Sequence, residues 1–338
     1  MNRSIVMCVV FTAAMASSFG TAYAWDRSHA TTFAVLPEGS AHPEGITMDP
    51  KGNVYVVTWD YEHPKNPGHL IVFAPDGKFQ RRVEISKASS RLGDVDFQPG
   101  TGDLLVVDYG GKQVLKVNAT TGASSVFITV PGDKVAPNGM AFDKQGNIYL
   151  TDSFQGTIWK TGTSGGAATP WVKSELLASH GCWSPLGANG LAFNREQSAM
   201  FVGNTGEGTI IKIPVVNGEA GEPKVFVSNV GGPDGMFVDE DDRLWVVLNR
   251  ADEVLVLDNT GRAVAKFGDF DGLDESGAPR GLLFPAEMMK IGDVLYVTNL
   301  TVDVRYLNRP QSPISQYAGE VKHYNIVRML AHIPRVPR

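Results

Sequence analysis

Four oxygen-bearing side chains recur at one position of a repeated phrase in this 338-residue sequence. The phrase reads PEGITMDPKGNVYVV from Pro43, PNGMAFDKQGNIYLT from Pro137 and PDGMFVDEDDRLWVV from Pro233. Carboxylates and amide carbonyls, without Cys or His, are the ligands that hard cations such as Ca²⁺ prefer. The second letter of the phrase, which we call the phase position, therefore predicts a site for a divalent cation at Glu44, Asn138, Asn189 and Asp234.

A purely structural role for the same residues is the alternative. Asn-Gly and Asp-Gly are among the strongest turn dipeptides because both residues tolerate positive φ. Glu44 fits this account poorly, since glutamate is a poor turn former, and the phase position holds Gly93 and Ala286 in two further copies of the phrase. From the residues alone, a metal site and a set of turns both remain open.

Six copies of the phrase indicate the elements that must position these residues. Successive phase positions lie 45 to 52 residues apart. Each is followed by an alternating segment, a turn and a nearly continuous apolar run, and two more short segments complete the unit. Four strands at this period are typical of a β-propeller blade, so we predict an all-β, six-bladed β-propeller.

The ends of the chain are predicted to close the ring together. Thr32–Leu36 occupies the place of the strand that precedes each phase position. The amino-terminal strand would then complete the last blade, whose other strands are expected at Glu287–Ile291, Val294–Asn299 and approximately Val321–Ile326. Closure of this kind leaves no open strand edge in the ring.

The first 24 residues have the layout of a secretory signal peptide. Arg3 precedes an apolar run, and Ala22 and Ala24 supply the small residues of a cleavage site. We expect cleavage after Ala24 and a periplasmic or secreted protein in which residues 25–338 form a single propeller domain. Mass spectrometry of the exported protein should then find Trp25 at the amino terminus, and an intact Met1 there would contradict the assignment.

Charge and composition limit the partners. The formal net charge is −6 and the 30 Lys and Arg residues are scattered, so no basic face is expected for nucleic acid. No apolar run reaches the roughly 20 residues of a membrane span. We expect a monomer that acts on a small molecule, with Cys182 as a small apolar side chain.

The phrases PEGITMD, PNGMAFDKQGNIYLTDS, ANGLAFNREQSAMFVGNT and PDGMFVDEDDRLWVV resemble the senescence marker protein/gluconolactonase (regucalcin-like) family of six-bladed propellers. This family is related to diisopropylfluorophosphatase and paraoxonase. The resemblance implies that Glu44, Asn138, Asn189 and Asp234 hold a catalytic Ca²⁺, or Zn²⁺, Mn²⁺ or Mg²⁺, at the mouth of the central channel. It implies hydrolysis of lactones or esters, with Asp234 activating water or attacking directly and Glu44 as the alternative.

Two other functions fit parts of the sequence. The stretch KVAPNGMAF lacks the arginine and Asn-Asp pair that several sugar-acid lactonases of the family carry, so the resemblance does not imply gluconolactone itself. The individual blades also resemble NHL repeats, which would suit a non-catalytic binding propeller. A phosphotriesterase-like hydrolase is the third possibility.

Long loops are expected around the mouth at 60–68, 174–188, 268–285 and 300–319, where functional lids often occur. We expect the rim residues His180, Arg280, Arg305 and Arg309 to be solvated, and Trp59, Trp183 and Trp245 to serve packing.

Overall fold

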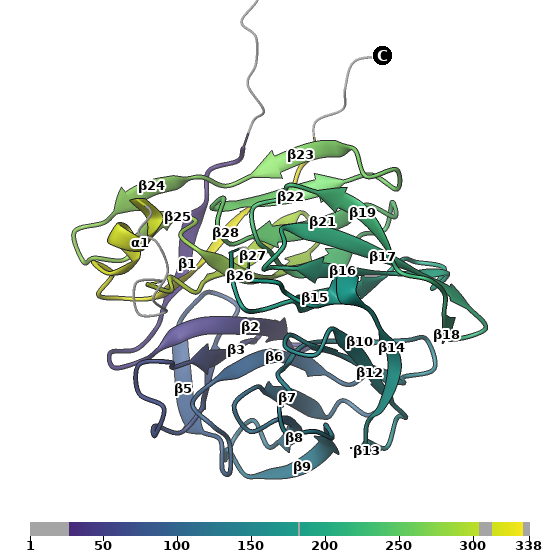
Figure 1. The fold of residues 1–338 in the computed structure, drawn as a ribbon. Coiled ribbons are helices and arrows are strands. Elements are labelled where there is room, and N and C mark those ends of the chain that lie inside the picture. Colours follow the sequence, from purple (N-terminus) through teal and green to yellow (C-terminus); the bar gives the residue numbers. More distant parts are fainter. Residues whose placement is uncertain (1–26, 182, 304–312, 334–338) are drawn as a thin grey trace, which may run out of the picture.

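The computed structural model describes residues 27–181, 183–303 and 313–333. The predicted signal segment, Cys182, Arg305 and Arg309 lie outside the described residues. Six antiparallel sheets surround a central channel, so the predicted six-bladed β-propeller is confirmed (Figure 1).

Each blade has four strands, which follow one another from the channel outwards. Blades 1 to 3 consist of β2 (His42–Met48), β3 (Val54–Trp59), β4 (His69–Phe73) and β5 (Phe79–Glu84); β6 (Leu92–Phe97), β7 (Leu104–Asp108), β8 (Gln113–Val117) and β9 (Ser124–Thr129); and β10 (Pro137–Phe142), β11 (Ile148–Asp152), β12 (Thr157–Thr161) and β14 (Thr169–Lys173). Blades 4 to 6 consist of β15 (Ala188–Phe193), β16 (Ala199–Asn204), β17 (Thr209–Val216) and β19 (Lys224–Ser228); β20 (Pro233–Val238), β21 (Leu244–Leu248), β22 (Glu253–Leu257) and β23 (Ala263–Phe267); and β26 (Pro285–Ile291), β27 (Val294–Asn299), β28 (Asn325–Leu330) and β1 (Thr31–Val35).

Short elements decorate this ring. β13 (Gly166–Ala167) extends blade 2, β18 (Glu219–Ala220) pairs with β17, and β24 (Phe270–Leu273) and β25 (Pro279–Gly281) form a hairpin. A 3₁₀ turn, η1, covers Glu175–Leu177, and the helix α1 covers Pro313–Ala318. None of the described helices is long and apolar enough to cross a membrane.

An aspartate in the first turn of a blade explains the repeated letters that follow the phase position. Asp49 Oδ1 accepts the backbone N–H groups of Lys51 and Asn53, and its Oδ2 accepts the Tyr55 hydroxyl at 3.0 Å. Asp143 and Asp239 bind their own turns in the same way. The phrase therefore encodes a turn that aligns the first strand with the second, in addition to the phase residue itself.

The apolar core lies between neighbouring blades. Trp245 and Val247 of β21 are fully buried and belong to one cluster with Leu295 and Val297 of β27. The nearly continuous apolar segments are thus second strands covered on both faces, as their composition predicts. This packing holds the innermost strands at fixed positions around the channel.

The two ends of the chain meet in blade 6, which confirms the predicted closure. β1 pairs with β28, and Figure 1 shows the amino-terminal strand beside this carboxy-terminal one. The predicted range Val321–Ile326 for the third strand is wrong, because that strand is β28 at Asn325–Leu330. Lys322 instead donates its backbone N–H to Gly277 in the turn of the β24–β25 hairpin, whereas Val327 supplies the buried face of blade 6.

Candidate functional site

The phase positions lie within the innermost strands of the six blades. A register shift occurs there in every blade, as between Pro137 and Met140 in β10. Asn138, Asn189 and Asp234 are strand residues and none of them has a positive φ. The turn explanation for these three residues is therefore wrong.

Glycines that follow four of the phase residues let the strands approach closely. An ideal Cβ at Gly190 would lie 2.1 Å from the carbonyl oxygen of Asp234, and one at Gly139 would lie 2.7 Å from that of Asn189. Any larger side chain would push neighbouring blades apart. The Asn-Gly and Asp-Gly pairs thus reflect close packing around the channel, and the phase positions form a narrow ring there, which we call the channel ring.

All four predicted donor residues are buried in this channel ring. Their exposed fractions are 7% for Glu44, 3% for Asn138, 4% for Asn189 and 5% for Asp234. Buried carboxylates and amides require compensation by hydrogen bonds or opposite charge. The partners of each residue therefore indicate what the ring can bind.

Two hydroxyl groups fix the orientation of the amides. Asn138 Nδ2 donates to Ser153 Oγ at 3.2 Å, and this hydroxyl donates to the carbonyl oxygen of Ala188 at 2.7 Å. Asn189 Nδ2 donates to Thr205 Oγ1 at 3.0 Å. The Thr205 hydroxyl in turn donates its proton to the carbonyl oxygen of Pro233. Because each hydroxyl has spent its single proton, it can only accept from the amide. Both amide oxygens are thereby left available as acceptors.

The carboxyl group of Asp234 lies beside a third polar residue. Asn249 Nδ2 donates to Asp234 Oδ2 at 3.2 Å, whereas the buried Asn249 Oδ1 has no hydrogen-bond partner among the described residues. Burial raises the pKa of Asp234 to about 7, against the opposing effect of hydrogen bonds from Asn249 and Asn189. Asp234 is thus poised to gain or lose a proton near neutrality.

Two acidic residues that the sequence argument missed increase the negative charge near the ring. Asp94 and Glu287 come directly after Gly93 and Ala286, in the two blades whose phase residues carry no donor. Burial, followed by the charges of Asp234, Glu287 and Asp94, raises the pKa of Glu44 well above its usual range. The residue after the phase position would have revealed them, because it is glycine in the other four blades.

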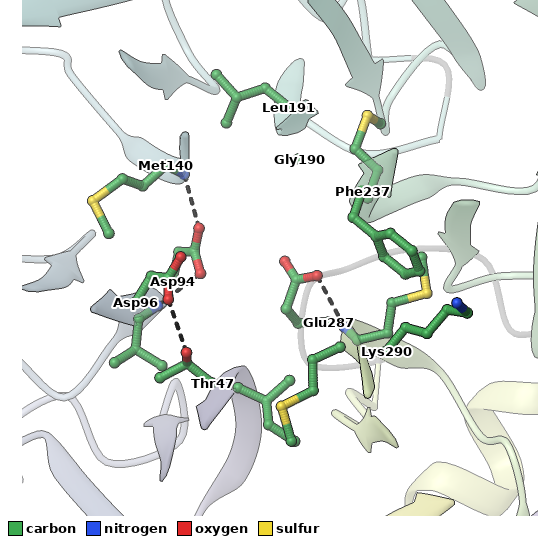
Figure 2. Close-up of a pocket in the computed structure, with 14 residues that line it drawn as sticks. Thr47, Asp94, Asp96, Met140, Gly190, Leu191, Phe237, Glu287 and Lys290 are labelled. Carbon is green, nitrogen blue, oxygen red and sulfur yellow. Dashed lines mark hydrogen bonds between the residues drawn. The ribbon is translucent and has the colours of Figure 1, made fainter. Parts of the chain in front are cut away.

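Below the ring, Asp94 and Glu287 line a cavity of ≈ 320 Å³ in the channel. Figure 2 shows the two carboxyl groups entering it from opposite sides, while Lys290 points away. Lys290 Nζ pairs instead with Glu240 Oε1 at 3.0 Å. Backbone N–H groups stabilise the two carboxyl groups, that of Met140 donating to Asp94 and that of Met288 to Glu287.

A family model matches the middle of the chain. Residues 102–268 match the model of the SMP-30/gluconolactonase/LRE-like region. This part of the chain is an SMP-30/gluconolactonase/LRE-like region. The resemblance seen in the repeated phrases is therefore confirmed, whereas a search of curated proteins found no match.

Solved structures with low sequence identity share the fold of this propeller. A gluconolactonase from Xanthomonas campestris has a TM-score of 0.61 and 14% identity, with 88% of each chain covered. A luciferin-regenerating enzyme has a TM-score of 0.61 and 14% identity, covering 86% of this chain and 92% of that one. Regucalcin from Agrobacterium tumefaciens, described as a calcium-binding protein, has a TM-score of 0.59 and 15% identity, covering 88% of this chain and 95% of that one.

The SMP-30/gluconolactonase/LRE-like region contains Asn138, Asn189 and Asp234, whereas Glu44 precedes it. Glu44 reaches the same ring because β2 lies between β26 and β6 around the channel. Its backbone carbonyl accepts the Thr298 hydroxyl of blade 6 at 2.7 Å. The four predicted residues thus come together only when the ring closes.

The donor set fits a hard cation by its chemistry. Two amide oxygens are held free by their hydroxyl partners, and two buried carboxyl groups lack a neutralising lysine or arginine among their hydrogen-bond partners in the described residues. No cluster of three or more His, Cys, Asp or Glu side chains suited to a metal occurs in the part of the chain that the structure describes. The proposed ligand set differs from such a cluster because half of it is amide.

The rim residues differ in their surroundings. His180 is exposed, and Arg280 donates to the carbonyl oxygen of Asp271 in the β24–β25 hairpin, which agrees with solvated side chains. Trp245 is fully buried as expected. The packing role expected for Trp183 is wrong, because this side chain is 50% exposed and lies beneath the Arg250 guanidinium at 3.6 Å.

Proposed function

We propose that this protein is an exported, divalent-cation-dependent hydrolase of lactones or esters. The observation that carries the proposal is the channel ring, in which two amide groups oriented by hydroxyl partners and two buried carboxyl groups occupy equivalent positions of the innermost strands. Membership of the SMP-30/gluconolactonase/LRE-like group supports hydrolysis, and the gluconolactonase neighbour supports a lactone. Export rests on the sequence of the first 24 residues.

Glu44, Asn138, Asn189 and Asp234 would hold the cation, for which Ca²⁺ suits the oxygen donors best. A bound divalent cation would polarise the carbonyl group of the substrate and stabilise negative charge on its oxygen. Four side chains do not saturate calcium, so room would remain for a carbonyl oxygen and water.

Asp234 is our candidate for activating the water. Burial raises the pKa of Asp234 to about 7 without a cation, and a bound cation would lower it, so we choose Asp234 for the place of its carboxyl group in the channel ring. Asn249 donates to one carboxyl oxygen and thereby orients the carboxyl group. The hydroxyl would add to the carbonyl carbon, the ester C–O bond would break, and the departing oxygen would receive the proton. Glu44 is the alternative base, and direct attack by Asp234 the alternative reaction.

Metal analysis and a substrate screen test this proposal. The purified protein should contain about one equivalent of divalent metal, and proton release should reveal hydrolysis of lactones or aryl esters. Phosphotriesters in the same screen test the phosphotriesterase-like alternative. A metal-free protein that hydrolyses none of the three classes would contradict the proposal and favour an NHL-type binding propeller.

Cation affinity should depend on pH because the cation competes with protons. A carboxyl group with a raised pKa keeps its proton in the metal-free protein until the pH exceeds that pKa. The affinity should therefore fall as the pH drops below the pKa of about 7 at Asp234. Each proton displaced contributes up to about tenfold per pH unit.

Calcium titrations followed by calorimetry at pH 6 and pH 8 measure this effect. The pH 8 titration should show the tighter binding, and at pH 6 the observed heat should vary with the ionisation enthalpy of the buffer because binding releases protons. Equal affinities at both values would mean that no carboxyl group with a raised pKa contributes to the site.

A further inference from the structure

Six equivalent residues surround the mouth of the channel above the ring. In each blade, the residue before the phase position pairs with a residue of the second strand, as Pro137 pairs with Asp152 in blade 3. The residue of interest is the next one along the second strand, which is Ser153 in that blade. The same register places these residues at one level in the six blades: Trp59, Tyr109, Ser153, Thr205, Asn249 and Leu300.

Blades 3, 4 and 5 have polar residues at this level. Ser153, Thr205 and Asn249 each hydrogen-bond to the phase residue of their own blade, which is Asn138, Asn189 or Asp234. Their side chains are committed to orienting the donors of the ring. This half of the mouth is therefore polar.

Blades 6, 1 and 2 have apolar residues at the same level. Leu300 is buried in a cluster with Ala286, and Trp59 packs against that cluster. The ring centroids of Trp59 and Tyr109 are 4.5 Å apart, and those of Tyr109 and Phe154 are 6.1 Å apart. The mouth is thus divided into a polar half and an apolar half.

The aromatic surface of blades 1 and 2 continues onto Phe154 of blade 3 and is partly exposed. Phe154 has 49% of its surface exposed and Trp59 is only partly buried. Tyr109 is 6% exposed, and its ring lies between those of Trp59 and Phe154 and contacts both. Trp59 packs as expected from its sequence and keeps part of its surface exposed. Large apolar side chains that remain exposed beside a polar site offer a surface for a ligand.

We propose that Trp59, Tyr109 and Phe154, which we call the aromatic ledge, bind an aryl group of the substrate. The substrate class would be aryl lactones or aryl esters rather than hydroxyl-rich sugar lactones. With the carbonyl group at the channel ring, the rest of the molecule must leave through the mouth, where the ledge offers apolar surface. Sugar hydroxyls would lose hydrogen bonds to water there, and each unsatisfied group is costly. This inference rests on the proposed function, because the ring sets where the carbonyl group lies.

Binding of two unreactive lactams tests the ledge without requiring hydrolysis. 3,4-Dihydro-2-quinolinone carries a fused benzene ring, whereas δ-valerolactam has the same amide ring without it. Burial of the benzene ring should make the wild-type protein bind the first about tenfold or more tightly. Trp59→Ser, which introduces the residue type of Ser153, and Phe154→Ala should each remove most of this preference while leaving δ-valerolactam binding unchanged.

Kinetics with dihydrocoumarin and δ-valerolactone give the second readout. The same variants should raise KM for dihydrocoumarin with little change in kcat, and should not affect the simple lactone, because the ledge binds ground and transition states alike. Phe79→Ala, which removes a half-exposed aromatic side chain from the outer strand of blade 1, is the matched control and should change nothing. Phe154→Ala keeps the test decisive if Trp59→Ser does not fold, since Phe154 is half exposed.

The outcomes separate the two proposals. Equal affinity for the two lactams, no binding of either, or a preference that survives both variants would overturn the ledge. A ledge-dependent preference in a protein that hydrolyses no lactone or ester would overturn the proposed hydrolysis alone. Aryl preference lost in both variants, with hydrolysis intact, supports both.

Discussion

Replacing Asp234 by Ala is expected to abolish both bound metal and hydrolysis while the propeller remains folded. The change removes one of the two charged donors and the candidate base. A loss of at least about a hundredfold in kcat/KM is expected when a preorganised charge and a base are removed together. Metal stoichiometry, hydrolysis and melting temperature should be measured on the same preparation.

Two further variants serve as the comparison and the control for Asp234→Ala. Asn189→Ala removes a neutral carbonyl instead of a charge, so it should weaken metal binding less than Asp234→Ala does. Asp241→Ala, in the first turn of the same blade, removes a carboxylate with 65% side-chain exposure and should leave metal and activity unchanged. Metal content that is the same in Asp234→Ala as in the wild type would contradict the cation site and with it the hydrolase.

Removing residues 25–37 should cost the protein its cooperative fold. This deletion takes away β1, which pairs with β28 and closes blade 6. Phe33, at 8% exposure, and Leu36, at 4%, would be lost from a cluster that contains Ile326 and Ile71. Thermal unfolding followed by circular dichroism should show a broad or absent transition in place of a sharp one.

Point variants within the same strand test the packing without deleting it. Phe33→Ala should lower the free energy of unfolding by about 3–5 kcal/mol, the usual cost of truncating a buried phenylalanine. Val35→Ala, on the same strand but 41% exposed, should have little effect. A deletion of residues 25–30 leaves β1 intact and serves as the second control. An unchanged melting temperature in the 25–37 deletion would refute closure by this strand.

The blade pattern was predictable because it is local. The apolar runs recur at every copy and a turn aspartate such as Asp49 recurs in three of them, with hydrogen bonds that lie within a few residues. The third strand of blade 6 was misplaced because the chain before it has no such repeated turn. Lys322 is held by a hairpin more than 40 residues away, and sequence patterns do not report contacts of that kind.

The level of the four predicted residues in the ring was predictable, whereas their electrostatics were not. Repetition alone brought Glu44, Asn138, Asn189 and Asp234 to one level of the ring. It did not reveal Asp94 or Glu287, which come one residue after the phase position and reach the channel because their blades lack the following glycine.

The sequence by itself determined the number of blades, the strand that closes them, and which residues occupy the six phase positions. These properties follow from periodic spacing, since equivalent positions of identical units must lie on one ring. Only the tertiary structure decided which hydroxyls orient the amides, how burial raises the pKa values of Glu44 and Asp234, and which half of the mouth is aromatic. Desolvation and hydrogen bonding depend on atoms from neighbouring blades, and their positions are fixed when the ring closes.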